Sequence, residues 1–512
     1  MTTASAWSMA LIGMHGTPVE VEAAVGAGLP RTVLVGLPDT ALYEARDRCK
    51  AAVAGAGLKW PDRLLTINLT PASLPKAGSH YDLAIVAAVL SSAQLVPSRP
   101  ASSTLFMGEL GLDGRVRAVR GILPALLAAR DHGLDTAVVP AEQLGEAELV
   151  EGMTVWGIND LADLVEVLHG RPVSHPSAPS QPARPSTDAQ LPDMADVQGQ
   201  GEARWGLEIA AAGGHHLFMH GPPGTGKTML ARRLPGLLPD LDDAHALEIS
   251  AVHSLAGREL HGALIRRPPF ADPHHTATVA AMVGGGSRIA KPGAISLAHC
   301  GVLFLDEAPE FGSPVLEALR TPLESGEVCL ARSGATVRYP ARFQLVLAAN
   351  PCPCGRYGIV GAQCTCTSLM VRRYAQRLSG PILDRVDLHV TMTNAGASPL
   401  RRGNGPAPDS SAVIRGRVLE ARDRQRRRLR GTPWQTNVEV PGGHLRTTPP
   451  PARGLDLIDA SIAKGTLSAR GIDKVLRVAW TLADLSGRDA LSADDIAAAM
   501  GLRASNAPGG MV

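Results

Sequence analysis

The chain has 512 residues, of which 45% are hydrophobic and only 3% aromatic, and its formal net charge is +2. A chain of this length is expected to form more than one domain, with cores built mostly from aliphatic side chains. Because 50 Lys and Arg are balanced by 48 Asp and Glu, a uniformly basic coat is excluded, and any contact with nucleic acid must come from local patches.

The amino terminus and the cysteines both favour the cytoplasm. Residues 1–5 lack the basic start and apolar run of a signal peptide. The nearest candidate for a membrane span, Leu83–Val96, is too short to cross a bilayer. The seven cysteines form no disulfide-like framework, which fits a reducing compartment. We therefore expect a cytoplasmic protein without membrane contact.

Segments rich in proline, glycine and serine divide the chain. Residues 170–195 contain six prolines and no apolar periodicity, which is typical of an extended linker. Residues 394–411 form a second connector of this kind. The division predicts an N-terminal domain over 1–169, a core over 196–393 and a C-terminal helical lid over 412–505.

The apolar patterns in these parts predict an α/β fold. The N-terminal domain alternates strand-like and helix-like pieces: strands at 32–35, 64–69 and 136–139, and helices at 40–56, 81–95 and 122–132. The core contains short apolar runs typical of central parallel strands, at 216–220, 302–305 and 343–349. After Ser410 the pattern becomes helical, and Ser492 is placed to cap the last helix.

A phosphate-binding loop follows the first of these core strands. Residues 221–228 fit GxxxxGK[ST], and a helix is expected at 229–234. Glycines let backbone N–H groups turn toward phosphate oxygens, the lysine reaches the β- and γ-phosphates, and the threonine hydroxyl can bind Mg²⁺. The residues expected to bind nucleotide are Gly221, Pro222, Pro223, Gly224, Thr225, Gly226, Lys227 and Thr228.

Polar residues end the other two core strands. Asp306 and Glu307 follow a buried strand, where Asp306 would hold Mg²⁺ and Glu307 would polarise the attacking water. Asn350 ends the next strand and can orient that water or sense the γ-phosphate. Residues 196–200 resemble the segment that lies against the adenine in AAA+ proteins. The three strand endings, in this order, indicate an AAA+ ATPase that uses ATP and Mg²⁺.

Longer runs give a more specific resemblance. They include FADPHHTATVAAMVGGG at 270–286, KPGAISLAHCGVLFLD at 291–306, ANPCPCG at 349–355 and LSGPILDRVD at 378–387. The chain resembles the ComM/YifB family of magnesium-chelatase-like AAA+ proteins over nearly its whole length. This resemblance implies a homo-hexameric helicase that drives DNA branch migration while incoming DNA recombines during natural transformation.

The resemblance also implies roles for two arginines. Arg385 lies where related motors place the arginine finger that reaches the neighbouring subunit's γ-phosphate, and a guanidinium there would neutralise charge during phosphoryl transfer. The alternative is a surface ion pair with Asp384 or Asp387. Arg470 matches the lid arginine called sensor 2, although it could be an ordinary surface residue at a helix start.

Two insertions are the expected DNA-contacting elements. The glycine-rich segment 283–298 predicts a protruding loop, and 326–342 predicts a hairpin with strands joined at 333–334. The hairpin resembles the one that grips DNA in minichromosome-maintenance helicases, so Arg332 and Arg338 are its candidate contacts. An ordinary hairpin with solvated arginines is the alternative.

A third basic element spans Arg415–Arg430, with eight arginines against two acidic residues. It reads either as a patch that neutralises phosphates or as a solvated lid helix, and both interpretations stay open. Since no aromatic platform accompanies these arginines, we expect sequence-independent contact with the DNA backbone.

Residues 60–140 resemble the peptidase domain of Lon without its serine–lysine dyad. Aligned on shared glycines, the serine position falls on His80 and the lysine position on Leu123, and Leu123 cannot accept a proton. Ser79 is adjacent but has no lysine partner. Peptidase activity is therefore not expected, and a ring-forming or DNA-binding platform is the expected role.

Four cysteines follow Asn350 as two pairs, Cys352 with Cys354 and Cys364 with Cys366. Four thiolates could hold Zn²⁺, although the usual pairs are spaced more widely, and four reduced thiols are the alternative. For the whole chain, the rival interpretations are the ATPase subunit of a magnesium chelatase and a nucleotide-gated chaperone.

Overall fold

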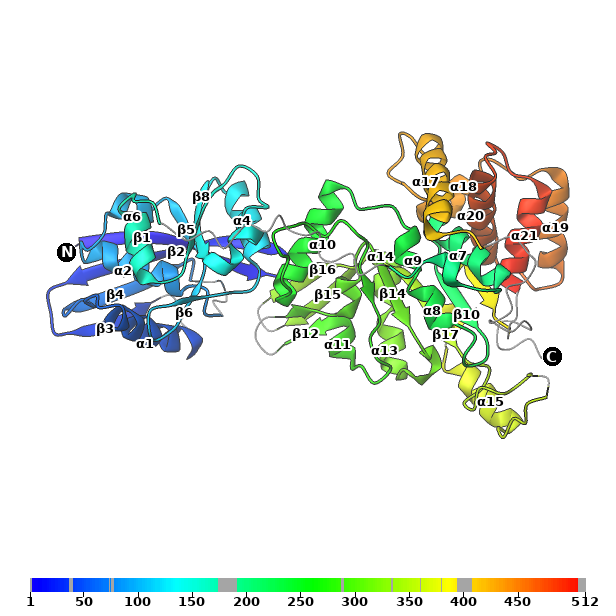
Figure 1. Cartoon of the computed structure of the whole chain (residues 1–512), viewed down its shortest axis with the longest axis horizontal. Helices are drawn as coiled ribbons and strands as arrows, with labels where there is room; N and C mark the ends of the chain where they lie inside the picture. The colour runs from blue at the N-terminus through cyan, green and yellow to red at the C-terminus, as the bar shows by residue number, and fades with distance from the viewer. Residues whose placement is uncertain are drawn as a thin grey trace.

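The computed structural model of the chain describes residues 2–35, 40–72, 74, 78–173, 191–286, 290–332, 335–359, 361–378, 380–393 and 408–504. Figure 1 shows three parts in a row: an N-terminal domain in blue and cyan, a core in green, and a helical lid in orange and red. Within the described ranges, no helix combines the length and apolar character needed to cross a bilayer. The mixed α/β fold with a helical C-terminal part agrees with the prediction.

The N-terminal domain is built on a seven-stranded sheet in the order β3-β4-β2-β1-β5-β8-β9. Its strands are β1 (Thr2–Ile12), β2 (His15–Gly26), β3 (Arg31–Val35), β4 (Leu64–Thr70), β5 (Thr104–Phe106), β8 (Thr136–Pro140) and β9 (Thr154–Ile158). The main helices are α1 (Thr40–Gly55), α2 (Asp82–Ser92), α4 (Ile122–Asp131) and α6 (Leu161–Leu168). The strands and helices predicted for this domain are therefore present.

The long β1–β2 ribbon at the centre of this sheet was not predicted. The two strands pair antiparallel from Thr2 with Val25 to Ile12 with His15. The residues of β1 that point into the domain are small, and two of them, Ala6 and Ser8, are fully buried. The alternation of apolar and polar residues that marks a strand is therefore weak in the sequence.

The core is a five-stranded parallel sheet in the order β11-β14-β17-β10-β18. Its strands are β10 (Leu217–His220), β11 (Phe270–Ala271), β14 (Val302–Leu305), β17 (Gln344–Ala349) and β18 (Leu388–Thr391). All residues of β14 and β17 are buried, as expected for central strands covered on both faces. Because β14, β17 and β10 are neighbours, their carboxyl ends meet at one edge of the sheet.

Helices cover this sheet on both faces. α7 (Gly201–Gly213), α8 (Lys227–Ala231) and α9 (Leu234–Leu237) pack on one face, and α13 (Ser313–Ala318) packs on the other. α14 (Arg320–Ser325) follows α13, and α10 (Asp243–Ala256) packs against the N-terminal domain. The helix expected at 229–234 differs from the prediction, since α8 begins at Lys227 and ends at Ala231. Pro235, in the first turn of α9, cannot continue a preceding helix.

The two predicted insertions are short hairpins. β12 (Gly284–Gly285) pairs with β13 (Lys291–Pro292), so the described part of the glycine-rich segment is held by strand pairing rather than forming an open loop. β15 (Glu327–Arg332) pairs with β16 (Ala335–Pro340), with Arg332 opposite Ala335 at the end of the ladder. The hairpin predicted at 326–342 is therefore present.

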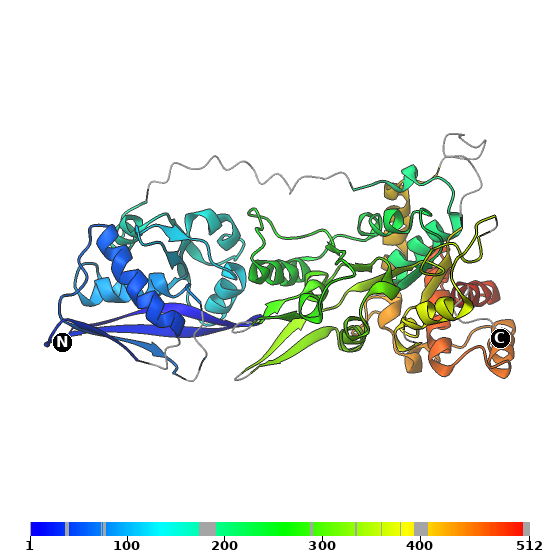
Figure 2. The same ribbon diagram turned by 90° about the horizontal axis from the view of Figure 1, so that it is seen from below.

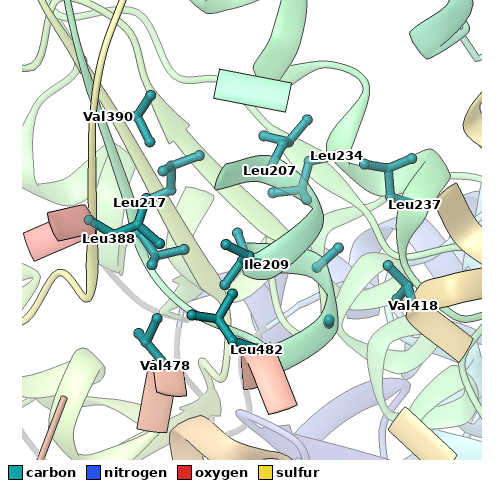
Figure 3. Packing of buried hydrophobic residues seen from close by; sticks show 14 of the residues in the cluster. Leu207, Ile209, Leu217, Leu234, Leu237, Leu388, Val390, Val418, Val478 and Leu482 are labelled. Carbon is teal, nitrogen blue, oxygen red and sulfur yellow. The ribbon is translucent and has the colours of Figure 1, made fainter. Parts of the chain in front are cut away.

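The lid packs onto the core through a continuous apolar cluster. Its helices are α17 (Ser411–Arg428), α18 (Gly442–Leu445), α19 (Ala452–Ala463), α20 (Ala469–Leu485) and α21 (Ala493–Ala504). Figure 3 shows Val478 and Leu482 of α20 beside Ile209 of α7 and Leu217 of β10. As predicted, Ser492 caps the last helix, and its Oγ accepts from the Asp495 N–H at 3.2 Å.

A buried polar contact also joins the lid to the sheet. The Lys474 ammonium of α20 lies 3.2 Å from a carboxylate oxygen of Asp387, which directly precedes β18. Burial alone would raise the pKa of Asp387, but Lys474 and His215 hold it well below its usual range. Removing one partner of such a pair typically costs about 3–5 kcal/mol, because the other charge is left buried without compensation.

The N-terminal domain contacts the core directly at two places. Met9 and Leu123 belong to one apolar cluster with Ala251 and Leu260 of the core. At the second place the β1–β2 turn meets the β15–β16 hairpin, where a Cβ added at Gly13 would lie 2.8 Å from a Val337 methyl carbon. Figure 2 shows the β1–β2 ribbon extending from the N-terminal sheet toward this hairpin.

Candidate functional site

The phosphate loop leaves the carboxyl end of β10 and leads into α8. Gly224 and Gly226 have φ values of +78° and +89°, a left-handed conformation that glycine adopts without steric cost. A Cβ at Gly221 would lie 2.3 Å from the Met392 carbonyl oxygen, so that position also requires glycine. Gln200 was given no individual role in the sequence analysis, yet its side-chain amide donates to the Thr225 carbonyl at 3.2 Å and holds the loop from behind.

Lys227 lies folded against its own loop. Its ammonium donates to the carbonyls of Gly221 at 2.6 Å and Pro222 at 2.8 Å, and to Asn350 Oδ1 at 3.0 Å. Burial lowers the pKa of Lys227 to about 8, against the opposing influence of Asp306 and Glu307. The structure thus brings Asn350 into direct contact with the phosphate-loop lysine, so the two residues can respond to one γ-phosphate.

Thr228 and Asp306 form the expected magnesium position. The Thr228 hydroxyl donates to Asp306 Oδ2 at 2.5 Å, from the start of α8 to the end of β14. A hydroxyl and a carboxylate are oxygen ligands of the kind that Mg²⁺ prefers, with waters completing its coordination. These two side chains would hold Mg²⁺ beside the nucleotide phosphates.

Glu307 has an unusual backbone conformation. Its φ of +50° is rare for a residue other than glycine, and such a conformation costs on the order of 1–3 kcal/mol. Its side chain is 51% exposed, and a carboxylate oxygen lies 3.7 Å from His275 Nδ1. Glu307 is therefore open to water, as a general base for hydrolysis must be. His275 was not assigned individually, although it lies inside the FADPHHTA run.

The two predicted arginines are held near one another by acidic residues. Arg385 pairs with Glu324 of α14 and donates to the Pro381 carbonyl. Arg470 Nη1 lies 3.8 Å from Asp384, the residue before Arg385, and its side chain is 74% exposed. Both arginines thus contact groups of their own core surface.

The structure describes the side chain of one candidate DNA contact, Arg338, and only the backbone of the other, Arg332. Arg338 pairs with Glu327 at 2.8 Å across the base of the hairpin, and its side chain is 61% exposed. Arg332 ends β15 nearest the connecting residues, while its side chain lies outside the described residues. Arg332 is thus the hairpin arginine whose backbone position is closest to the tip.

The arginines of 415–430 mostly bind the protein itself, which neither interpretation of the sequence anticipated. Arg415 pairs with Asp240, and Arg417 with Glu208. Arg428 pairs with Asp484 of α20 and lies over the Trp480 ring. These partners are distant in sequence, so the charges of α17 looked unpaired there. With the pairs Arg424–Glu420 and Arg426–Asp423 inside the helix, five of the eight arginines are engaged in ion pairs.

The positions that align with the Lon dyad are occupied by His80 and Leu123. His80 is half-buried, one of its ring nitrogens lies 3.0 Å from the Met9 carbonyl oxygen, and desolvation lowers the pKa of His80 to about 4. Leu123 is fully buried at the contact with the core. Ser79 hydrogen-bonds to Glu109. The predicted cysteine pairs lie together in the segment after β17.

Replacing Lys227 by Ala should weaken ATP binding by about 10- to 100-fold, the loss expected for hydrogen bonds to a charged group. The change removes the cation expected at the phosphates, together with two hydrogen bonds to loop carbonyls and one to Asn350. Titration with a fluorescent ATP analogue measures the effect, and exposed Lys50 provides a matched Lys→Ala control. Equal affinity in the Lys227→Ala and parent proteins would contradict this site.

Comparison with known protein families covers almost the whole chain. The family described as magnesium chelatase, subunit ChlI, matches residues 193–399. Two related families match the ends: subunit ChlI of Mg-chelatase at 21–143, and magnesium chelatase subunit ChlI C-terminal at 408–503.

Individual proteins are similar over a comparable length. The chain is 50% identical to an uncharacterized protein of Mycobacterium tuberculosis, over 99% of this chain and 100% of that protein. It is 40% identical to the Escherichia coli protein YifB, over 97% of this chain and 96% of YifB. It is 38% identical to the competence protein ComM of Haemophilus influenzae, over 98% of each chain.

Proposed function

The chain belongs to the ComM/YifB family of magnesium-chelatase-like AAA+ proteins, and from this premise we propose that it is a ring-forming DNA motor driven by ATP hydrolysis. ATP hydrolysis, the activity that membership of this family suggests, would supply the energy for movement along DNA. The motor would act in the cytoplasm, as a homo-hexamer, on single-stranded or branched DNA during recombination of incoming DNA.

The site supports the hydrolysis step through its own residues. Lys227 would hold the β- and γ-phosphates, and Asn350, 3.0 Å away, would sense the γ-phosphate or orient the water. Glu307 would take a proton from that water as it attacks the γ-phosphorus and the bond to the leaving ADP breaks. Mg²⁺, held by Thr228 and Asp306, would neutralise charge on the phosphate oxygens when bound.

The observation that carries the DNA proposal is the similarity to ComM, named a competence protein, over 98% of both chains. The match therefore includes the N-terminal domain as well as the ATPase core. We also propose that this domain is a platform without peptidase activity, because the positions of a serine–lysine dyad hold His80 and Leu123. Leu123 is fully buried and has no group that could accept a proton.

A magnesium-chelatase ATPase subunit is the second candidate, and the matching families favour it by name. The two functions differ in their response to DNA. We expect single-stranded DNA or a four-way junction to raise the ATP hydrolysis rate of the full-length chain. An unchanged rate with single-stranded, duplex and junction DNA would favour the chelatase subunit or a chaperone.

Replacing Arg332 by Ala should weaken the stimulation by DNA and leave ATP hydrolysis without DNA nearly unchanged. Binding to phosphates implies that DNA affinity falls with salt whatever the base sequence. The slope of log affinity against log salt concentration should shrink by about one for each phosphate that the variant no longer neutralises. Fluorescence anisotropy of labelled DNA over a salt series measures this slope.

Two other arginines serve as matched controls for Arg332. Arg338 is already paired with Glu327, so Arg338→Ala should change the slope less. Exposed Arg427 of α17 is a control outside the hairpin. Unwinding of junctions by Arg332→Ala at the parent rate would exclude the hairpin as the DNA-gripping element.

A further inference from the structure

Four cysteine sulfurs meet in the segment between β17 and α15 (Ser368–Gln376). Cys352 Sγ lies 3.3 Å from Cys354 Sγ and 3.8 Å from Cys364 Sγ, and the last two sulfurs are 3.6 Å apart. Cys366 completes the group, in which all four sulfurs lie within 4.8 Å of one another. Residues twelve positions apart in the chain are thus brought to one point.

These separations match a tetrahedral metal site. Sulfur atoms bound to zinc at about 2.3 Å are separated by about 3.8 Å along the edges of the tetrahedron. A disulfide would require about 2.05 Å, well below the closest pair. In the sequence, the narrow spacing within each cysteine pair weakens the prediction of a zinc site. In the structure, Cys352 and Cys354 face the same point despite this spacing.

Apolar packing does not account for the shape of this segment. Among its described residues from 351 to 367, only Cys352 and Gly355 are buried. Figure 1 shows α15, which follows directly, projecting from the body of the core. The Tyr357 backbone N–H donates to Cys352 Sγ at 3.3 Å, an arrangement that stabilises a metal-bound thiolate. A bound metal would replace the missing core.

We propose that Cys352, Cys354, Cys364 and Cys366 bind one Zn²⁺ as four thiolates, and that the bound metal braces the phosphate loop. A closed set of four sulfur ligands is typical of structural zinc, because it leaves no position open for water or substrate. Binding releases the thiol protons to solvent and changes no oxidation state.

The brace rests on contacts on both sides of the cysteines. A Cβ placed at Gly355 would lie 2.6 Å from Pro223 Cδ, so this backbone touches the phosphate loop. Beyond the cysteines, Tyr374 of α15 is buried and interacts with the backbone of Asn350. Fixing the sulfurs would therefore hold both Pro223 and Asn350. The zinc site does not depend on the proposed ATPase function, whereas the predicted effect of zinc on nucleotide binding rests on that function.

Metal content tests the site directly. The full-length chain, purified without an affinity tag or chelator, should contain about one zinc per chain by elemental mass spectrometry. The double change Cys364→Ser with Cys366→Ser should remove it. Cys329 is exposed and lies outside the cluster, so Cys329→Ser is the matched control and should keep the metal. A chain without zinc after reconstitution with Zn²⁺ would overturn the proposal.

A conservative variant separates ligand loss from misfolding. Histidine is also a zinc ligand, so Cys364→His should retain zinc where Cys364→Ser loses it. Cobalt substitution gives a second readout, since Co²⁺ bound by four thiolates absorbs strongly in the visible and near-ultraviolet. Equal metal loss in the His and Ser variants, with unchanged far-ultraviolet circular dichroism, would contradict ligation at this position.

Nucleotide binding tests the brace. Stripping zinc from the parent should weaken binding of a fluorescent ATP analogue on the order of tenfold, and adding Zn²⁺ back should restore it. If the parent holds zinc at full occupancy and its ATP affinity does not change when the zinc is removed, the brace is overturned but the metal site stands. Failure of the ATPase proposal itself would show as absent ATP binding in the zinc-loaded parent.

Discussion

Replacing Arg385 by Ala should lower the ATP turnover of the assembled protein by about 10³- to 10⁵-fold while ATP binding stays near the parent value. The guanidinium pairs with Glu324 and the Pro381 carbonyl on its own core surface, so its loss should not disturb the phosphate loop of the same chain. In a ring, the same surface would present Arg385 to the γ-phosphate of the next subunit.

Mixing variants tests that arrangement. Rings made only of Arg385→Ala subunits and rings made only of Glu307→Gln subunits are each expected to be inactive. Some interfaces in a mixed ring would join an intact Glu307 to an intact Arg385, and part of the turnover should return. No recovery on mixing, with mixed rings verified by size and composition, would argue that Arg385 does not act across the interface.

The second large effect concerns Glu307. Glu307→Gln should keep ATP bound and reduce the turnover rate by about 10²- to 10⁴-fold, because the amide has the same shape but cannot accept the proton of water. Single-turnover measurement of phosphate release, alongside an ATP-binding titration, separates the chemical step from binding.

Glu310 provides a matched control three residues away. It is exposed and pairs with Arg377 at 2.8 Å, away from the Thr228–Asp306 contact. Glu310→Gln should therefore hydrolyse ATP at close to the parent rate. Turnover by Glu307→Gln as fast as that of Glu310→Gln would mean that another group activates the water.

The residues of the candidate phosphate site could be named from the sequence because its motifs are local. The loop at 221–228 and the acidic pair after 302–305 each follow from a few adjacent residues, and a parallel sheet brings such strand ends together. The hydrogen bond from Lys227 to Asn350 was not predicted, although both residues were assigned to the site. It depends on which strands are neighbours in the sheet.

Features that depend on distant partners were missed or left open. The arginines of α17 looked like a free basic helix because Glu208, Asp240 and Asp484 lie far away in the sequence. The β1–β2 ribbon was missed because most of the buried side chains of β1 are small. The exposure of Cys329 could not be predicted either, because this residue lies on a hairpin whose faces the sequence does not assign.

The contact between the N-terminal domain and the core has a consequence for how strongly the two domains must bind one another. Because the two domains belong to one chain, each experiences the other at an effective concentration on the order of millimolar. An interface of modest intrinsic affinity is then almost always formed. The contacts at Leu123 and Gly13 would therefore hold the two domains together even if each contributed little by itself.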